Sequence, residues 1–347
     1  MIVFAVPGDL EAPTGGYAYC RRVMAELRAL GRAVEVMALG EGFPHAAGTV
    51  RRAAVERIAA RAATANVVVD GLALGVLPEL AAAAPGRYVG LVHHPLALET
   101  GLGREAAAHL AASEKAALAG AAHVIATSAT TARLLASDYG VAAGRLAVVR
   151  PGTDPAPPAR GTPGPPALLS VGSLVPRKGH DVLLAAVGDV RDLAFRLTVV
   201  GDASRDGACA AALVAQVEAS GLSDRVTLAG AVDTAALARL YDEADLFVLA
   251  SRHEGYGMAY AEAIARGLPV IGTTAGAIPE VVGGAGLLVA PDDPQSFAAA
   301  LRHLLGDSDT RRALAAKARA AAANLPRWSD AGRAFADRLD SVPLIAT

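Results

Sequence analysis

Short apolar runs alternate with longer helical stretches along nearly the whole of this 347-residue chain. The runs are rich in Val, Ile and Leu, whereas the stretches between them are dominated by Ala, Leu and Arg. A continuously apolar strand is buried on both faces, and its alternation with helices is typical of parallel β-α-β units. The pattern therefore predicts an α/β protein with doubly wound sheets.

The predicted strands form two groups separated by a proline-rich segment, residues 151–166, in which seven of 16 residues are proline. Such a segment cannot continue a helix or a central strand, so we interpret it as a semi-rigid linker between two domains. The first group comprises residues 2–6, 33–37, 66–70, 88–92, 123–126 and 145–149, and the second comprises residues 167–171, 195–200, 226–228, 246–249, 269–271 and 286–289.

Composition and charge exclude several classes of protein. Hydrophobic residues make up 53 % of the chain and charged residues 19 %, which excludes a disordered chain. A net charge of −2 gives no basic field for nucleic acid. The two cysteines, Cys20 and Cys209, form neither a disulfide framework nor a metal-ligand spacing. With no signal peptide and no membrane-spanning run, we expect a cytoplasmic protein.

The densest group of chemically useful residues lies at 251–266, after the strand at 246–249. Gly255 and Gly257 flank Tyr256 and precede Met258, where a helix begins; such glycines let backbone N–H groups approach a phosphate at a helix start. The carboxylates of Glu254 and Glu262 are suited to vicinal hydroxyls. Together these features favour a sugar–diphosphate–ribose ligand. The alternative is two solvated acidic residues near a helix N-terminus.

Glu254 and Glu262 match the signature E-G-[FY]-G-x4-E, and residues 267–271 and 276–282 continue the likeness. The chain thereby resembles the retaining glycosyltransferases of family 4, which have the GT-B fold. The resemblance implies two Rossmann-like domains facing across a cleft: an acceptor domain at 1–155, a donor domain at 156–325 and a helix at 326–347 returning to the first domain. It also implies transfer from a nucleotide-diphosphate sugar, UDP-linked as first guess, to an acceptor hydroxyl.

In family members Glu254 would hold the sugar hydroxyls and Glu262 the ribose, and Lys178 would match the lysine that binds the diphosphate. Arg177 and Lys178 follow the strand at 167–171, where the amides of Gly172 and Ser173 would assist. Ser173 stands where the family often has arginine, and Arg177 is the candidate substitute. From the bare sequence alone, a pair of exposed basic residues in a loop is the favoured interpretation of Arg177 and Lys178.

Three residues at strand ends, Gly201, Asp202 and Val232, would by resemblance lie against the base. The pair Gly15 and Gly16 resembles the glycine loop of the family's first strand, or else it is an ordinary helix start.

His93 and His94 directly follow the strand at 88–92, at the edge where an α/β sheet presents catalytic groups. The resemblance favours His93 as the active-site histidine, and His94 is the second candidate. No Asp-x-Asp metal-diphosphate motif is placed at a suitable loop, so we expect no metal and no cofactor other than the donor.

Other functions stay open at this stage. An NDP-sugar epimerase or a phosphorylase would share the two-domain plan, and a nucleotide-sugar-binding protein without turnover would share the donor site. A membrane-surface adaptor would use the arginine-rich helix at 50–61, but this helix lacks aromatic anchors, so peripheral membrane contact is not favoured. The sequence identifies neither the acceptor nor the oligomeric state.

Overall fold

The computed structural model describes residues 1–341 and divides into two compact units. The first is Met1–Gly152 together with the C-terminal segment from Pro326, and the second is Thr153–Leu325. The boundary between the two units thus lies after residue 152, whereas the sequence analysis predicted it after residue 155. Residues 342–347, the last part of the predicted segment 326–347, lie outside the described residues.

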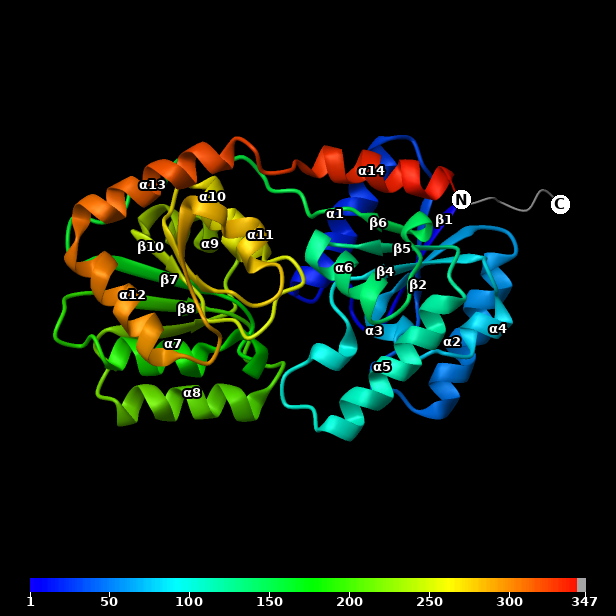
Figure 1. The fold of residues 1–347 in the computed structure, drawn as a ribbon, viewed down its shortest axis with the longest axis horizontal. Helices are drawn as coiled ribbons and strands as arrows, with labels where there is room; N and C mark the ends of the chain where they lie inside the picture. The colour runs from blue at the N-terminus through cyan, green and yellow to red at the C-terminus, as the bar shows by residue number, and fades with distance from the viewer. Residues whose placement is uncertain (342–347) are drawn as a thin grey trace. The chain divides into compact units, whose positions relative to one another are not determined.

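The first unit is built on a six-stranded parallel sheet in the order β2-β1-β3-β4-β5-β6. Its strands are β1 (Ile2–Val6), β2 (Val34–Ala38), β3 (Asn66–Asp70), β4 (Tyr88–Val92), β5 (His123–Ala126) and β6 (Leu146–Val148). Its helices are α1 (Gly15–Ala29), α2 (Gly48–Ala62), α3 (Gly71–Leu74), α4 (Leu80–Ala83), α5 (Arg104–Ala119), α6 (Ala129–Ser137) and α14 (Trp328–Asp340). Helices cover both faces of the sheet (Figure 1), which explains why β1 and β4 are buried along their whole length.

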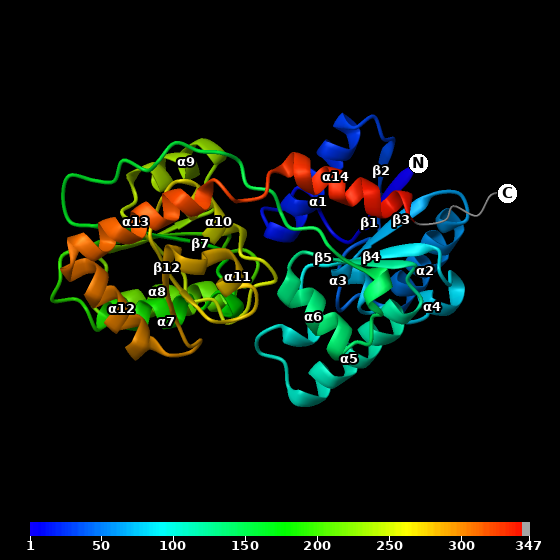
Figure 2. The same ribbon diagram turned by 45° about the horizontal axis from the view of Figure 1, so that its top comes forward.

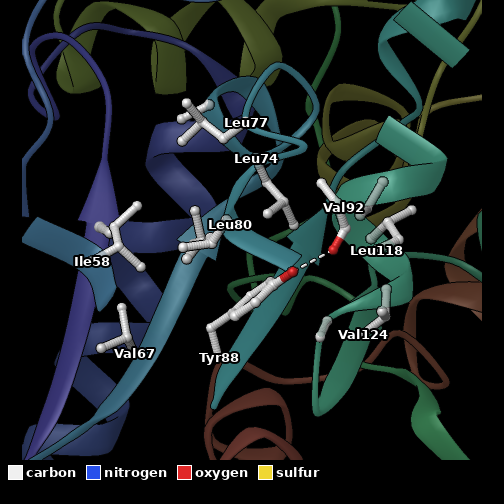
Figure 3. Packing of buried hydrophobic residues seen from close by; sticks show 14 of the residues in the cluster. Ile58, Val67, Leu74, Leu77, Leu80, Tyr88, Val92, Leu118 and Val124 are labelled. Carbon is white, nitrogen blue, oxygen red and sulfur yellow. Dashed lines mark hydrogen bonds between the residues drawn. The ribbon is translucent and has the colours of Figure 1, made fainter. Parts of the chain in front are cut away.

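The core of the first unit lies between the sheet and α2–α5 (Figure 3). Ile58 of α2, Val67 of β3 and Leu118 of α5 are fully buried in it. Tyr88 of β4 is also fully buried, and its hydroxyl donates to the carbonyl oxygen of Ala117. The phenol therefore contributes its ring to the core without leaving a polar atom unpaired.

The C-terminal helix α14 packs against α1 of the first unit, and both views show the two helices side by side (Figures 1 and 2). Phe335 stacks on Phe4 of β1 with ring centroids 5.7 Å apart, and the guanidinium of Arg22 lies 4.9 Å from the ring centroid of Trp328. The predicted return of the last helix to the first half of the chain is confirmed.

The second unit is built on a parallel sheet in the order β12-β11-β10-β7-β8-β9. Its strands are β7 (Ala167–Val171), β8 (Arg196–Val200), β9 (Val226–Gly230), β10 (Leu246–Val248), β11 (Val270–Thr273) and β12 (Gly286–Val289). Its helices are α7 (His180–Gly188), α8 (Gly207–Ala219), α9 (Thr234–Glu243), α10 (Met258–Ala265), α11 (Ile278–Val282), α12 (Pro294–Gly306) and α13 (Ser308–Ala322). The predicted α/β fold with two parallel sheets is confirmed.

The proline-rich segment differs from the predicted linker, because most of it is part of the second unit. The backbone N–H of Ala159 donates to the carbonyl of Arg266 at 2.8 Å, and Arg160 forms an ion pair with Asp242 of α9. Proline prevents this segment from forming a helix or central strand, but it leaves the other residues free to hydrogen-bond to a neighbouring surface.

Helix α2, the arginine-rich helix of the sequence analysis, buries Ala54 and Ile58 and exposes Arg51 and Arg52. Within residues 1–341, no helix has both the length and the apolar character that crossing a bilayer requires.

Candidate functional site

The topology of the second sheet brings two loops together at one edge. From β7 the chain proceeds to β8 and β9 on one side, and later strands β10, β11 and β12 lie on the other. The order therefore reverses between β7 and β10, and at such a switch point the loops after the two strands diverge and leave room for a ligand. Here they carry residues 172–179 and 249–257.

The loop after β7 is held by close backbone packing. A Cβ atom on Gly201, which follows β8, would lie 1.8 Å from the carbonyl oxygen of Gly172, so only glycine allows the two loops to approach this closely. The imidazole Nε2 of His180, at the start of α7, lies 3.1 Å from the same carbonyl oxygen. Burial lowers the pKa of His180 to about 4, so the ring is neutral and its Nε2–H donates to Gly172.

Glu254 lies at the centre of a buried ion-pair cluster with Lys178 and Arg177. Its Oε1 accepts from Lys178 Nζ at 2.6 Å and from Ser251 Oγ at 2.7 Å, and its Oε2 lies 3.4 Å from an Arg177 guanidinium nitrogen. Arg177 also donates to the carbonyl of His253 at 2.8 Å. The structure thus brings Glu254 together with Arg177 and Lys178, which the sequence analysis placed in a separate motif.

The two cations keep the buried Glu254 carboxylate charged. Glu254 is 6 % exposed, and burial by itself would raise its pKa, but Lys178 and Arg177, together with the Ser251 hydroxyl, hold the pKa at about 2. The carboxylate is therefore ionised and is held by both cations. Lys178 and Arg177 are the cationic groups that this edge of the sheet offers to an anion.

Helix α10 begins beside the cluster at Gly257, whose φ of 101° lies in the left-handed region that favours glycine. Within the described part of the chain, no side chain caps this helix, so amides of its first turn, such as that of Met258, point outward as donors. Tyr256 and Gly255, which precede Gly257, are buried. Uncapped amides and the helix dipole both favour a negatively charged ligand at this point.

Glu262 lies one turn further into α10, and Tyr241 of α9 fixes its carboxylate. The Tyr241 hydroxyl donates to Glu262 Oε2 at 3.0 Å, and the Arg266 guanidinium lies 4.4 Å from the centroid of the Tyr241 ring. Burial raises the pKa of Glu262, although the Tyr241 hydroxyl and Arg266 act in the opposite direction. Glu262 is therefore a preoriented acceptor for a hydroxyl donor.

The other predicted donor residues lie in the turns after β7, β8 and β9 and form local contacts there. The Asp202 carboxylate accepts a hydrogen bond from the backbone N–H of Ser204 at 2.8 Å and thereby stabilises the turn in which both residues lie. The backbone carbonyl of Asp202 accepts from the N–H of Leu174 at 2.9 Å. Val232 follows β9 and is partly buried. Ser173 accepts from the N–H of Val175 through its carbonyl.

In the first unit, His93 and His94 have different partners. His93 Nε2 lies 3.5 Å from Asp70 Oδ2 at the end of β3, whereas His94 Nε2 lies 3.5 Å from Glu99 on the adjoining loop. Gly15 and Gly16 form the first turn of α1, and a Cβ on Gly16 would lie 3.3 Å from the His93 ring. The glycine pair is thus a helix start that also leaves room for this imidazole.

The sequence analysis missed three polar residues that orient these groups: Tyr241, Ser251 and Asp70. Asp70 was recognisable as a carboxylate that ends an apolar strand at the edge where ligands bind. Tyr241 and Ser251 carry no such signal, because a tyrosine in an amphipathic helix and a serine after a strand are common in any α/β protein.

Two family models match the chain. Residues 13–157 match the model described as Glycosyltransferase Family 4, and residues 165–307 match the one described as Glycosyl transferases group 1.

Among curated relatives, the D-inositol 3-phosphate glycosyltransferase of Segniliparus rotundus is 35 % identical over 171 residues, which are 48 % of this chain and 37 % of that protein. The enzyme of the same name from Nocardia farcinica is 35 % identical over 228 residues, which are 60 % of this chain and 51 % of that protein. The chain thus spans about half or less of the length of these relatives.

Solved structures show the same fold. Sucrose-phosphate synthase from Thermosynechococcus elongatus superimposes with a TM-score of 0.81 at 24 % identity, covering 97 % of both chains. Anabaena HepE in complex with UDP and glucose superimposes with a TM-score of 0.75 at 21 % identity, covering 98 % of this chain and 99 % of that one. With two glycosyltransferase models together matching most of the chain and the fold shared over nearly the full length, the chain belongs to glycosyltransferase family 4, with the GT-B fold.

Proposed function

We propose that this protein is a retaining glycosyltransferase that moves a sugar from a nucleotide-diphosphate sugar to an acceptor hydroxyl. The observation that carries this proposal is the buried cluster of Lys178, Arg177 and Glu254 at the switch point of the second sheet. UDP-sugars are the first donors to test, because Anabaena HepE was solved with UDP and glucose.

A donor diphosphate would compete with Glu254 for Lys178 and Arg177. Lys178 and Arg177 now share Glu254, so a diphosphate arriving beside the start of α10 would draw Lys178 onto its oxygens. Glu254 would then be available to accept hydrogen bonds from hydroxyls of the sugar. As the sugar–phosphate bond breaks, negative charge grows on the leaving diphosphate, and Lys178 would stabilise it in a site with little water.

Glu262 would hold the ribose of the same donor. Its carboxylate lies on α10, the helix whose start would face the diphosphate, and the Tyr241 hydroxyl already orients it. Two vicinal hydroxyls on a carboxylate form charge-assisted hydrogen bonds, which are stronger than neutral ones. The positive groups of Lys178, Arg177 and the helix start would serve where other glycosyltransferases use a divalent ion, so we propose that transfer needs no metal.

The experiment is a panel of nucleotide sugars, first by thermal shift and then by turnover. Donors that stabilise the protein are incubated with an acceptor panel that includes D-inositol 3-phosphate, the compound in the relatives' name, and a cell extract. Mass spectrometry then detects the products. We expect one donor class to be hydrolysed slowly alone and transferred faster with an acceptor.

Lys178→Met and Lys317→Met form a matched pair of variants for this test, because Lys317 is exposed on α13. We expect Lys178→Met to lower turnover by about 100-fold or more and Lys317→Met to leave it unchanged. Binding without turnover would instead indicate a nucleotide-sugar-binding protein, and recovery of an epimerised donor would indicate an epimerase.

A further inference from the structure

The first unit contains a buried group of three metal-ligating side chains from three different elements. Cys20 lies on α1, Asp70 ends β3 and His93 follows β4. One ligand atom from each lies within 4.8 Å of the other two. Cys20 Sγ is 3.8 Å from Asp70 Oδ2, and His93 Nε2 is 3.5 Å from the same oxygen.

The electrostatics of this group are unusual for three side chains in a protein core. Asp70 is 3 % exposed and, within residues 1–341, forms no ion pair with a lysine or arginine. Its Oδ1 accepts from the N–H of Leu72 at 2.9 Å, which leaves Oδ2 facing Cys20 and His93. Oδ2 thus faces a sulfur and a nitrogen ligand atom, and the three atoms together can coordinate one cation.

His93 supplies a second sign of a ligand site. Its Nε2 is buried and has no hydrogen-bond partner among the described residues, although it is aimed at Asp70. Tyr19 packs edge-on against the ring with centroids 5.4 Å apart, and Gly16 lies against its other atoms. These contacts fix the plane of the ring. The His93 side chain is 21 % exposed, so it connects the cluster with solvent.

We propose that Cys20, Asp70 and His93 bind a borderline-soft divalent cation, Zn²⁺ above all, through one sulfur, one oxygen and one nitrogen. Tetrahedral zinc with these ligands places neighbouring ligand atoms about 3.3–3.6 Å apart, close to the two distances measured here. Three protein ligands leave the fourth position to water. Binding converts the Cys20 thiol to a thiolate and releases its proton to the solvent.

A bound cation would occupy His93, so zinc would inhibit sugar transfer. This consequence rests on the proposed function and on the role of active-site histidine that the family resemblance implies for His93. The metal would therefore be an inhibitor of the enzyme and not a cofactor of transfer.

Cobalt provides a direct readout of binding that is independent of activity. The full chain is stripped with chelator, and Co²⁺ is added while the absorption spectrum is recorded. We expect the strong visible bands of tetrahedral cobalt and the near-ultraviolet charge-transfer band of a thiolate ligand, both removed by one equivalent of Zn²⁺. Absence of the thiolate band in the wild-type protein overturns the site.

The chain offers a matched control, because its other cysteine, Cys209, lies on α8 of the second unit. Cys20→Ser should lose the thiolate band and bind Zn²⁺ more than about 100-fold more weakly, whereas Cys209→Ser should behave as wild type. Because Cys20 is fully buried and its replacement could affect folding, His93→Gln provides a second test, with the same loss of affinity and altered visible bands. A band that survives Cys20→Ser, or disappears in Cys209→Ser, overturns the assignment.

Donor hydrolysis measured with added Zn²⁺ then tests the inhibitory consequence. We expect inhibition of the wild type and of Cys209→Ser, reversed by EDTA. Intact cobalt bands without inhibition by zinc would contradict the predicted inhibition but would still support the metal site. Failure of every donor to react would reject the proposed function and would leave the spectroscopic result unaffected.

Discussion

Glu254 illustrates how burial and ion pairing compete at a single residue. Burial disfavours its charged form, yet the two cations and the Ser251 hydroxyl reverse that effect and keep it ionised. Removing Glu254 alone, or its cationic partners alone, would leave a buried charge without a partner of opposite sign, which is costly. The cluster is therefore stable only as a unit, or with a ligand that replaces one of its members.

This competition predicts a specific dependence of stability on pH. The pKa of Glu254 is lowered from its ordinary 4.5 to about 2, so its stabilising effect is complete above pH 4.5 and is lost as the pH falls toward 2. The full loss, reached below about pH 2, is on the order of 3 kcal/mol, of which about 2 kcal/mol falls between pH 5 and pH 3. Urea unfolding measured between about pH 5 and pH 3 should show this decline in the wild type and a smaller one in Glu254→Gln. Parallel profiles for the two proteins would contradict the pairing.

A second prediction at this scale concerns Glu262. Glu262→Ala should weaken binding of both donor and free nucleotide by roughly 1.5–3 kcal/mol, because the ribose hydroxyls lose a charged acceptor. Tyr241→Phe is the companion variant, since it keeps the carboxylate but removes the hydroxyl that orients it; a smaller loss is expected. Calorimetry with donor and nucleotide measures both, and unchanged affinity in Glu262→Ala would remove the ribose assignment.

At the scale of elements, helix α5 fixes the loop that follows β4. Glu114 of α5 is buried and accepts from the backbone N–H of Leu96 at 3.1 Å, just beyond His93 and His94. Burial raises the pKa of Glu114 to about 8, even though the Leu96 N–H favours the ionised form. The folded protein thus keeps a proton on Glu114 that the unfolded chain releases near pH 4.5. The free energy of unfolding therefore contains a contribution from this proton that is complete below pH 4.5 and is lost as the pH rises toward 8.

Glu114→Gln should remove that dependence, because the amide keeps an oxygen for Leu96 and cannot ionise. We expect the free energy of unfolding of the variant to rise relative to wild type by a few kcal/mol between about pH 5 and pH 8. Glu105→Gln, at an exposed position of the same helix, should follow the wild type. A constant difference between Glu114→Gln and wild type across this range would mean that Glu114 is already ionised.

The elements were largely predictable from the sequence, whereas the contacts between them were not. Strands β3, β4 and β5 fall at the predicted residues, because a strand buried on both faces needs an uninterrupted apolar run. The pairing of Lys178 with Glu254 joins residues 76 apart, and that of Tyr241 with Glu262 joins residues 21 apart. No local pattern specifies such pairs, since they depend on strand order within the sheet.

For the whole molecule, the proposed function predicts activity without metal. The second unit provides Lys178, Arg177 and the start of α10 as positive groups for the leaving diphosphate, so transfer should persist in excess EDTA. Initial rates with and without chelator measure this directly, with magnesium and manganese added back as controls. A preparation that loses activity in EDTA and regains it with either ion would contradict the proposal.

The stereochemistry of transfer is the most demanding test of the proposed mechanism. An inverting enzyme needs a general base on the face opposite the leaving group, and His93 beside Asp70 has the form of such a base with its orienting carboxylate. In the proposed function, however, the leaving phosphate lies beside Lys178 and Arg177, which would stabilise it as it departs. That phosphate can accept the proton of the incoming hydroxyl on the same face, so no separate base is required.

In this mechanism His93 positions the sugar, or stabilises positive charge through its carbonyl oxygen, which accepts one hydrogen bond from Thr127 at 3.1 Å. We therefore predict that an α-linked donor gives an α-linked product and that His93→Ala lowers turnover without changing the anomer formed. The anomeric coupling constant of the isolated product measures the outcome for both proteins. A β-linked product from the wild type would show that the retaining mechanism is wrong, although the fold and the donor site remained as described.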